Sequence, residues 1–158
     1  MTFDWASLSP ADLREEASMF RHDHDDGSDC YFDADAGDWT LQIIDPSSVD
    51  AFDSQDAARE WLRDEITGLR ADGMEVRAAG YEQMIADGIE DPVVLGASNG
   101  RLALWDGWHR TAIAMVRGEQ LLAIVGTKAS QTPAPETGAE HIACFRLPSN
   151  DTAQAARA

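Results

Sequence analysis

Residues 91–127, DPVVLGASNGRLALWDGWHRTAIAMVRGEQLLAIVGT, decide the expected fold. Three short apolar runs in this stretch predict buried strands at residues 92–95, 101–105 and 121–126. The first two runs are separated by Ser98-Asn99-Gly100, a strong signal for a tight turn between strands. Between the last two, an Asp-Gly break predicts a helix that begins at Trp108 and ends with Gly118 as its C-cap.

The flanking sequence adds further elements. Ser9 and Pro10 are typical of a helix start, as N-cap and first helical residue. A second helix, capped by Asp53 or Ser54, carries one apolar stripe, Ala58, Leu62, Ile66 and Leu69. The other expected elements are a strand at 39–45, a helix at 81–87 and a last strand at 141–147.

Alternating strands and helices predict an α/β or α+β class with a small mixed sheet, and we expect α+β. Residues 1–148 should form a single domain, with an N-terminal helical and acidic extension, and residues 149–158 a flexible tail. The apolar residues expected in one sheet core are Ile43, Val93, Val94, Leu102, Leu104, Ile113, Leu122 and Ile124.

The charge restricts the partners that the protein can bind. The 158 residues include 29 acidic and 12 basic side chains, a formal charge of −17, and Lys128 is the only lysine. Affinity for nucleic acids and anionic membranes depends on clustered Lys and Arg, so we expect neither partner. The same composition fits a high-salt habitat or a GC-rich genome.

Cysteine content and hydropathy indicate the compartment. Cys30 and Cys144 are too few for a disulfide framework. No apolar run approaches the roughly 18 residues of a membrane-spanning helix, and the sequence MTFDWASLSP lacks the layout of a signal peptide. We therefore expect a cytoplasmic protein with reduced thiols.

The densest cluster of chemically capable side chains, Asp106, His109, Arg110 and Thr111, lies where the second strand breaks into the helix. A helix N-terminus offers unpaired N–H groups and a positive dipole end, which suit a phosphate. Arginine adds a permanent charge with a fork geometry for phosphate oxygens. An arginine in the first helical turn is disfavoured by the dipole, so Arg110 needs an anion or an acidic neighbour.

The segment at residues 22–38, HDHDDGSDCYFDADAGD, invites a metal interpretation because His22, His24 and seven aspartates crowd together. The EF-hand pattern fails there, since a central Gly27 would leave the histidines in ligand positions. A solvated acidic loop is the preferred interpretation.

From about Tyr81 to Thr127 the chain has a helix ending in a glycine, PVVL, a turn, a strand, DGWHR opening a helix, a glycine and a closing strand. This order resembles the ParB/sulfiredoxin superfamily, a small α+β fold whose members bind nucleoside triphosphates. It is most similar to the branch with an Asp-Gly-x-His-Arg motif, which includes kinases of free amino acids.

The resemblance implies roles for individual residues. Gly107, His109 and Arg110 match the positions that hold nucleotide phosphates in the family, and Asp106 matches the acidic position of the kinase-like branch. Trp108 stands where sulfiredoxins have their nucleophilic cysteine, so sulfiredoxin chemistry is not expected. The Gly-Glu-Arg-Arg motif and the helix-turn-helix region of partitioning ParB proteins are not found in the sequence.

Several of these residues also have a structural interpretation. Asp106 can bind Mg²⁺, act as a general base or cap the helix. His109 can position a phosphate, move a proton or fill a partly buried helix face. The hydroxyl of Thr111 can bind the ligand or lie on the helix surface. Three residues on one helical face, Trp108, Ala112 and Met115, are expected in the core rather than as a base-stacking platform.

The first functional hypothesis is a Mg²⁺-dependent kinase that passes a phosphate from ATP or another nucleoside triphosphate to a small hydroxylated or amino-acid-like acceptor. The expected catalytic residues are Asp106 and His109, with Asp106 as metal ligand. The expected nucleotide contacts are Gly107, Trp108, His109, Arg110 and Thr111. The alternative is a non-catalytic nucleotide-binding module that controls a protein contact, and nuclease activity is third because no basic track is present.

Overall fold

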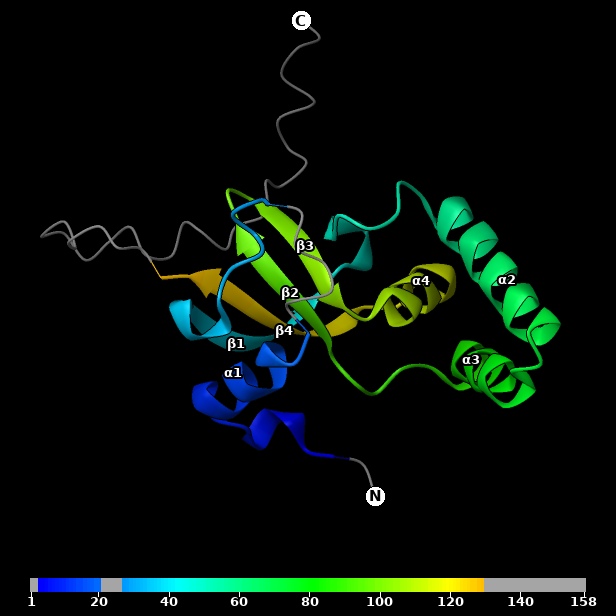
Figure 1. The fold of residues 1–158 in the computed structure, drawn as a ribbon, viewed down its shortest axis with the longest axis horizontal. Helices are drawn as coiled ribbons and strands as arrows, with labels where there is room; N and C mark the ends of the chain where they lie inside the picture. Colours follow the sequence, from blue (N-terminus) through cyan, green and yellow to red (C-terminus); the bar gives the residue numbers. More distant parts are fainter. Residues whose placement is uncertain (1–2, 21–26, 130–158) are drawn as a thin grey trace, which may run out of the picture.

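A computed structural model describes residues 3–20 and 27–129 of the chain. These residues form a small α+β domain with a four-stranded mixed sheet and four α-helices, as Figure 1 shows. The elements are α1 (Pro10–Ser18), β1 (Gly37–Ile44), α2 (Gln55–Ala71), α3 (Glu75–Asp87), β2 (Val93–Ser98), β3 (Arg101–Asp106), α4 (Trp108–Arg117) and β4 (Leu121–Lys128), with short 3-10 turns at Trp5–Ser7, Ala34–Ala36 and Pro46–Ser48.

The strands have the order β1-β4-β2-β3. The central pair, β2 and β4, is parallel, and both outer pairs are antiparallel. In the β2–β3 hairpin, Asn99 and Gly100 have φ angles of 52° and 77°. Two consecutive positive φ angles match the twist of a two-residue hairpin and explain the Asn-Gly sequence, so the predicted turn is confirmed.

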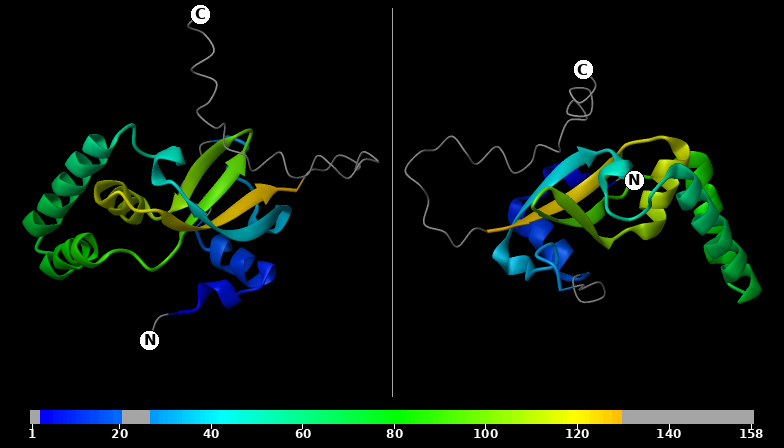
Figure 2. Two further views of the ribbon diagram at one scale, coloured as in Figure 1. Left: turned by 180° about the vertical axis from the view of Figure 1, so that it is seen from behind. Right: turned by 90° about the horizontal axis from the view of Figure 1, so that it is seen from above.

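Helices cover both faces of this sheet (Figures 1 and 2). One face packs against α1 through a cluster that includes Leu13, Trp39 and Trp105. The other face packs against α4, and α2 and α3 lie on the far side of α4. Because α4 is enclosed between the sheet and two helices, its residues from Thr111 to Met115 are all buried.

Two of the predicted helix starts are confirmed by their capping bonds. The Ser9 hydroxyl accepts from the backbone N–H of Asp12, and the Asp12 carboxylate accepts from the Ser9 N–H, which completes a capping box. The Ser54 side chain caps α2 by accepting from the N–H of Ala57. All four residues of the predicted apolar stripe on α2 are buried.

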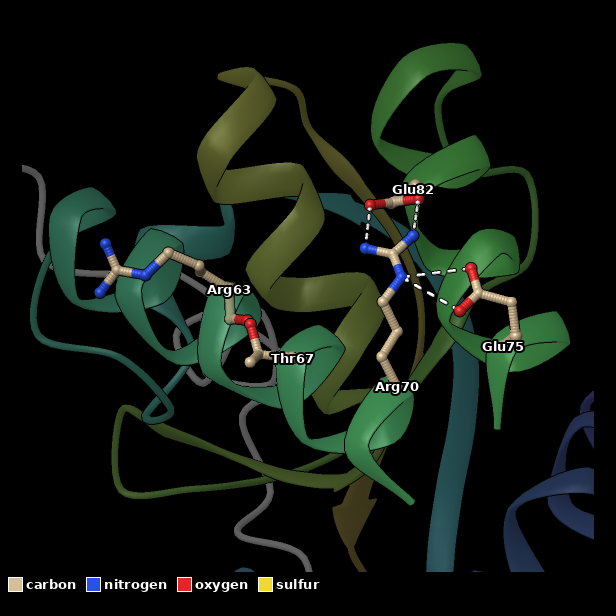
Figure 3. A network of polar contacts seen from close by, with 5 residues as sticks. All are labelled: Arg63, Thr67, Arg70, Glu75 and Glu82. Atoms are coloured by element: carbon tan, nitrogen blue, oxygen red, sulfur yellow. Dashed lines mark hydrogen bonds and ion pairs between the residues drawn. The ribbon is translucent and has the colours of Figure 1, made fainter. Parts of the chain in front are cut away.

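The third helix begins six residues earlier than predicted, at Glu75 rather than Tyr81. Its N-cap, Met74, makes no side-chain capping bond, so the sequence carries no start signal there. Arg70 at the end of α2 holds α3 instead (Figure 3): its guanidinium donates to Glu75 at 3.2 Å and to Glu82 at 2.6 and 2.8 Å. This exposed network fixes the helix that forms one wall of the site described below.

Six of the eight predicted core residues are buried, but Ile43 is 68% exposed and Leu122 is half-buried. The two are paired in register between β1 and β4. They lie on the α1 face, because Trp39 and Ile124, at even spacings from them, pack against α1. A nine-residue helix is only about 13 Å long, so α1 does not cover the full strand, and the prediction of a buried Ile43 was wrong.

The predicted strand at residues 141–147, the tail at 149–158 and Cys144 lie outside the described residues, as does part of the acidic segment at 22–38. Cys30, within that segment, is buried. In the parts of the chain that the structure describes, no helix is both long enough and apolar enough to cross a membrane.

Candidate functional site

A cleft of about 530 Å³ opens at the N-terminus of α4. Its volume lies within the roughly 300–1,000 Å³ range typical of small-molecule sites. Five of the six predicted site residues line it, together with one residue before β2 and three residues from α3. We call it the α4 cleft, and its lining consists of Arg77, Tyr81, Met84, Asp91, Asp106, Gly107, Trp108, His109 and Arg110.

Gly107 makes the sharp turn from β3 into α4. It is the N-cap residue, with φ 107° and ψ 32°, in the left-handed region that favours glycine. A Cβ atom at this position would lie 2.5 Å from Cγ1 of Val93, so the site also lacks space for a side chain. Glycine is therefore required by both conformation and packing.

This turn corrects one interpretation of Asp106, which is not the N-cap of α4. The cap residue is Gly107, and no side chain within the described chain caps the first turn. The N–H groups of that turn are therefore not occupied by a side-chain cap, as an anion site requires.

The carboxylate of Asp106, at the end of β3, is bound instead by Arg110, four residues later, whose Nη2 donates to it. The other terminal nitrogen of Arg110 donates to the carbonyl oxygen of Pro92 at 2.5 Å. The Arg110 and Asp106 side chains are only 22% and 31% exposed, so the pair is partly shielded from water. The acidic neighbour expected for an arginine in the first helical turn is therefore Asp106.

His109 is held by residues from two other helices. Its Nε2 lies 3.1 Å from Oε1 of Glu65 on α2. Its ring is stacked on Tyr81 of α3, with 4.1 Å between centroids and 8° between planes. A carboxylate only accepts hydrogen bonds, so Nε2 carries the proton and, in neutral histidine, Nδ1 is the unprotonated nitrogen.

Tyr81 also contacts Arg77 on the rim of the cleft. Nε of Arg77 donates to the Tyr81 hydroxyl at 3.2 Å, and its guanidinium lies 5.8 Å from the ring centroid. This hydrogen bond raises the pKa of Arg77, which keeps its charge at all ordinary pH values. The stack from Arg77 to Tyr81 to His109 places a second guanidinium at the same cleft as Arg110.

The other two predicted residues, Trp108 and Thr111, are less accessible to a ligand. Trp108 is half-buried and packs edge-on against Phe52, with 5.7 Å between centroids, while Ala112 and Met115 are buried as expected. Thr111 is fully buried rather than on the helix surface, and its hydroxyl donates to the carbonyl oxygen of Gly107 at 3.0 Å. It does not line the cleft, so we leave it out of the proposed ligand contacts.

Sequence reasoning missed Glu65, Arg77 and Tyr81. Glu65 precedes the motif by more than 40 residues. Its one signal in the sequence is its place four residues from both Trp61 and Leu69, beside the apolar stripe of α2. Arg77 lies in the part of α3 that was not predicted as helix. Their roles depend on the packing of α2 and α3 around α4.

The charges in the cleft differ from those of the chain as a whole. Arg77 and Arg110 stand beside Asp91 and Asp106, which gives a balanced lining in a protein of net charge −17. In the described residues, no group of three or more His, Cys, Asp or Glu side chains is close enough to enclose a metal ion. The cleft lining offers two carboxylates, Asp91 and Asp106, and Arg110 already binds that of Asp106.

Comparison of the chain with models of protein families, with curated proteins and with solved structures gives no match.

Proposed function

We propose that this protein is a nucleotide-dependent phosphotransferase with a ParB/sulfiredoxin-like fold that binds the phosphates of ATP or another nucleoside triphosphate in the α4 cleft. The observation that carries the proposal is the convergence of two arginines, a histidine and two carboxylates at a helix N-terminus that no side chain of residues 3–20 and 27–129 caps. The order of strand, tight turn, strand, Gly107 turn, helix and strand is also the order that the family resemblance predicts. The expected location is the cytoplasm, where nucleoside triphosphates are available.

The phosphates would be held by backbone and side chains together. The N–H groups at the start of α4 form the positive end of the helix dipole, which favours an anion. Arg110 and Arg77 supply charge-assisted hydrogen bonds from two sides of the cleft. Gly107 provides the sharp turn, packed against Val93, that brings the start of α4 to the cleft.

Arg110 links phosphate binding to the chemistry of Asp106. In the structure, the Arg110 guanidinium donates to the Asp106 carboxylate and neutralises its charge. A phosphate that binds Arg110 competes for the same donors and thereby releases the carboxylate. The free Asp106 then takes the proton of the acceptor hydroxyl as general base.

The transfer itself is a displacement at phosphorus. A bond forms between the acceptor oxygen and the γ-phosphorus, and the bond from this phosphorus to the bridging β–γ oxygen breaks. The nucleoside diphosphate leaves with the electron pair of that bond, and the acceptor proton passes to Asp106. Positioning and charge neutralisation supply most of the rate enhancement in such reactions.

Two further groups support this reaction. In its alternative role, as metal ligand rather than base, Asp106 would hold a Mg²⁺ ion that neutralises phosphate charge. His109 is held by Glu65 and Tyr81, and its Nε2 proton is donated to the Glu65 carboxylate. The ring is therefore positioned to accept a proton at Nδ1 or, in its charged form, to donate a hydrogen bond to a phosphate oxygen.

A second candidate function is a non-catalytic nucleotide-binding module that controls a contact with another protein. The ion pair between Asp106 and Arg110 favours it, because a carboxylate in such a pair is not available as a base or metal ligand. In this case nucleotide binding would break the pair without phosphate transfer.

Radiolabelled nucleotide separates the two functions. The full chain is incubated with Mg²⁺, ATP or CTP labelled on the γ-phosphate, and a small-molecule cell extract. Transfer of label to a small molecule, lost in Asp106→Asn, supports the phosphotransferase. Nucleotide binding without transfer supports the module, and absence of binding contradicts both.

A further inference from the structure

A second, smaller hollow adjoins the α4 cleft on the side of α1. It has a volume of about 170 Å³ and is lined by Trp5, Glu16, Phe20, Asp91, Pro92, Val94, Asp106, Arg110 and Ile124. We call it the α1 hollow. Asp91, Asp106 and Arg110 line both cavities, so the cavities meet at the ion pair.

We propose that the α1 hollow is the acceptor site, and that the acceptor is a small amino alcohol with an apolar group and no carboxylate. This inference rests on the proposed phosphotransferase function. Donor and acceptor must meet at the transferred phosphoryl group. The two cavities share only the residues that would neutralise the phosphate and accept the hydroxyl proton, so the larger cavity suits the nucleotide and the smaller one the acceptor.

The size of the hollow limits the acceptor. Its volume of about 170 Å³ is well below the roughly 300–1,000 Å³ of pockets for drug-sized ligands. The hollow therefore suits a molecule of a few heavy atoms rather than a whole nucleotide.

The apolar lining indicates an aliphatic group on the acceptor. Trp5 and Phe20 contribute half-buried aromatic side chains from the N-terminal segment, and Val94 and Ile124 contribute buried aliphatic ones from the sheet. An aliphatic group that leaves water for this surface binds more tightly, because burial of apolar area is favourable.

The charged side chains that line the hollow indicate an amine on the acceptor and argue against a carboxylate on it. Three carboxylates line the hollow, Glu16, Asp91 and Asp106, against one guanidinium. That guanidinium, on Arg110, already donates to Asp106 and to the Pro92 carbonyl. An ammonium group is therefore attracted to the hollow, and an anionic group is repelled by Glu16 and Asp91.

Combined with the transfer reaction, these features define the acceptor chemically. Its hydroxyl lies toward Asp106, which takes the proton as the oxygen–phosphorus bond forms and the nucleoside diphosphate leaves. Its ammonium group lies toward Glu16 and Asp91, and its aliphatic group contacts Trp5 and Phe20.

Three probes of nearly equal size test the assignment by calorimetry on the full chain without nucleotide. L-valinol has the hydroxyl, amine and aliphatic group, isoamyl alcohol lacks the amine, and L-valine has a carboxylate in place of the hydroxymethyl group. We expect saturable binding of L-valinol, at least tenfold tighter than either other probe. Glu16→Gln should weaken L-valinol at least tenfold, while Glu15→Gln, which removes the same charge from the exposed neighbour outside the hollow, should change it less than twofold.

Nucleotide binding is measured separately on the same variants. If ATP or CTP binds but the three probes bind equally or not at all, the acceptor assignment is overturned and the proposed function stands. If L-valinol binds with the expected selectivity and no nucleotide binds, the hollow is an amine site and the phosphotransferase is rejected. Equal effects of Glu16→Gln and Glu15→Gln would also overturn the assignment.

Discussion

Arg110 of α4 binds the carboxylate of Asp106 at the end of β3, at the wall between the α4 cleft and the α1 hollow. An ion pair across one helical turn on an exposed helix contributes little to stability. Here the pair is about three-quarters buried and each partner lines both cavities. The two side chains therefore restrain each other at the point where a ligand would bind.

This relationship predicts that one substitution lowers turnover without weakening nucleotide binding. Asp106→Asn removes the anion that occupies Arg110 but is nearly isosteric, so nucleotide affinity should be unchanged or increase. Turnover should fall about a hundredfold or more, because the amide cannot accept the proton. Calorimetry and label transfer measure the two quantities, and a fully active Asn variant would exclude Asp106 as the base.

Gly107→Ala should destabilise the protein strongly. A left-handed conformation costs a non-glycine residue roughly 1–2 kcal/mol, and the contact of the new Cβ with Val93 at 2.5 Å adds roughly 1–3 kcal/mol of overpacking. Gly100→Ala is the matched control, because Gly100 also has a positive φ, 77°, but open space around it. In urea unfolding, equal losses for the two variants would show that contact with Val93 is unimportant.

Glu65→Gln should allow the proton of neutral His109 to lie on either ring nitrogen. In the native protein the carboxylate fixes the proton on Nε2, whereas an amide can also donate to an unprotonated Nε2. Nitrogen NMR of the imidazole should therefore show one neutral tautomer in the native protein and a mixture in the variant. Glu60→Gln, on the exposed face of the same helix, should leave the spectrum unchanged. A single unchanged tautomer in Glu65→Gln would argue against a positioning role.

The Arg70 network predicts a pH dependence of stability. Its hydrogen bonds hold the pKa of Glu82 below the usual value of that carboxyl group. The resulting stabilisation is present above the ordinary glutamate pKa and is lost as the pH falls through the lowered pKa of the folded state. Glu82→Gln should therefore lower the melting temperature slightly at neutral pH, and the difference from the native protein should vanish in acid. A difference that persists in acid would contradict this origin.

Local signals in the sequence identify most elements of the fold. Ser9 and Ser54 mark helix starts, Asn99-Gly100 marks the hairpin, and Gly118 ends α4 with φ 68°. Each acts through a capping bond or a positive φ angle, which depends on few neighbours. Such features can be predicted without knowledge of the packing.

Features that depend on tertiary packing were not predicted. Ile43 is exposed because α1 is short, and α3 begins at Glu75 because Arg70 and the packing of Ala78 hold it. The candidate site also combines residues that local sequence identifies with residues that only packing brings in. Its motif residues could be predicted from the sequence, whereas Glu65 depends on how α2 packs against α4.

The measurement that tests the account most directly is calorimetric titration of the full chain with ATP and CTP, in the presence of Mg²⁺, for the native protein, Arg110→Ala and Arg63→Ala. Arg63 is 69% exposed on α2, so its substitution removes the same charge away from the cleft. Loss of the charge-assisted bonds of Arg110, roughly 1.5–3 kcal/mol each, should weaken binding of at least one nucleotide about tenfold to a hundredfold, and Arg63→Ala should bind as the native protein does. Equal affinities of all three folded proteins, or no nucleotide binding by the native protein, would contradict the assignment of the α4 cleft as a phosphate site.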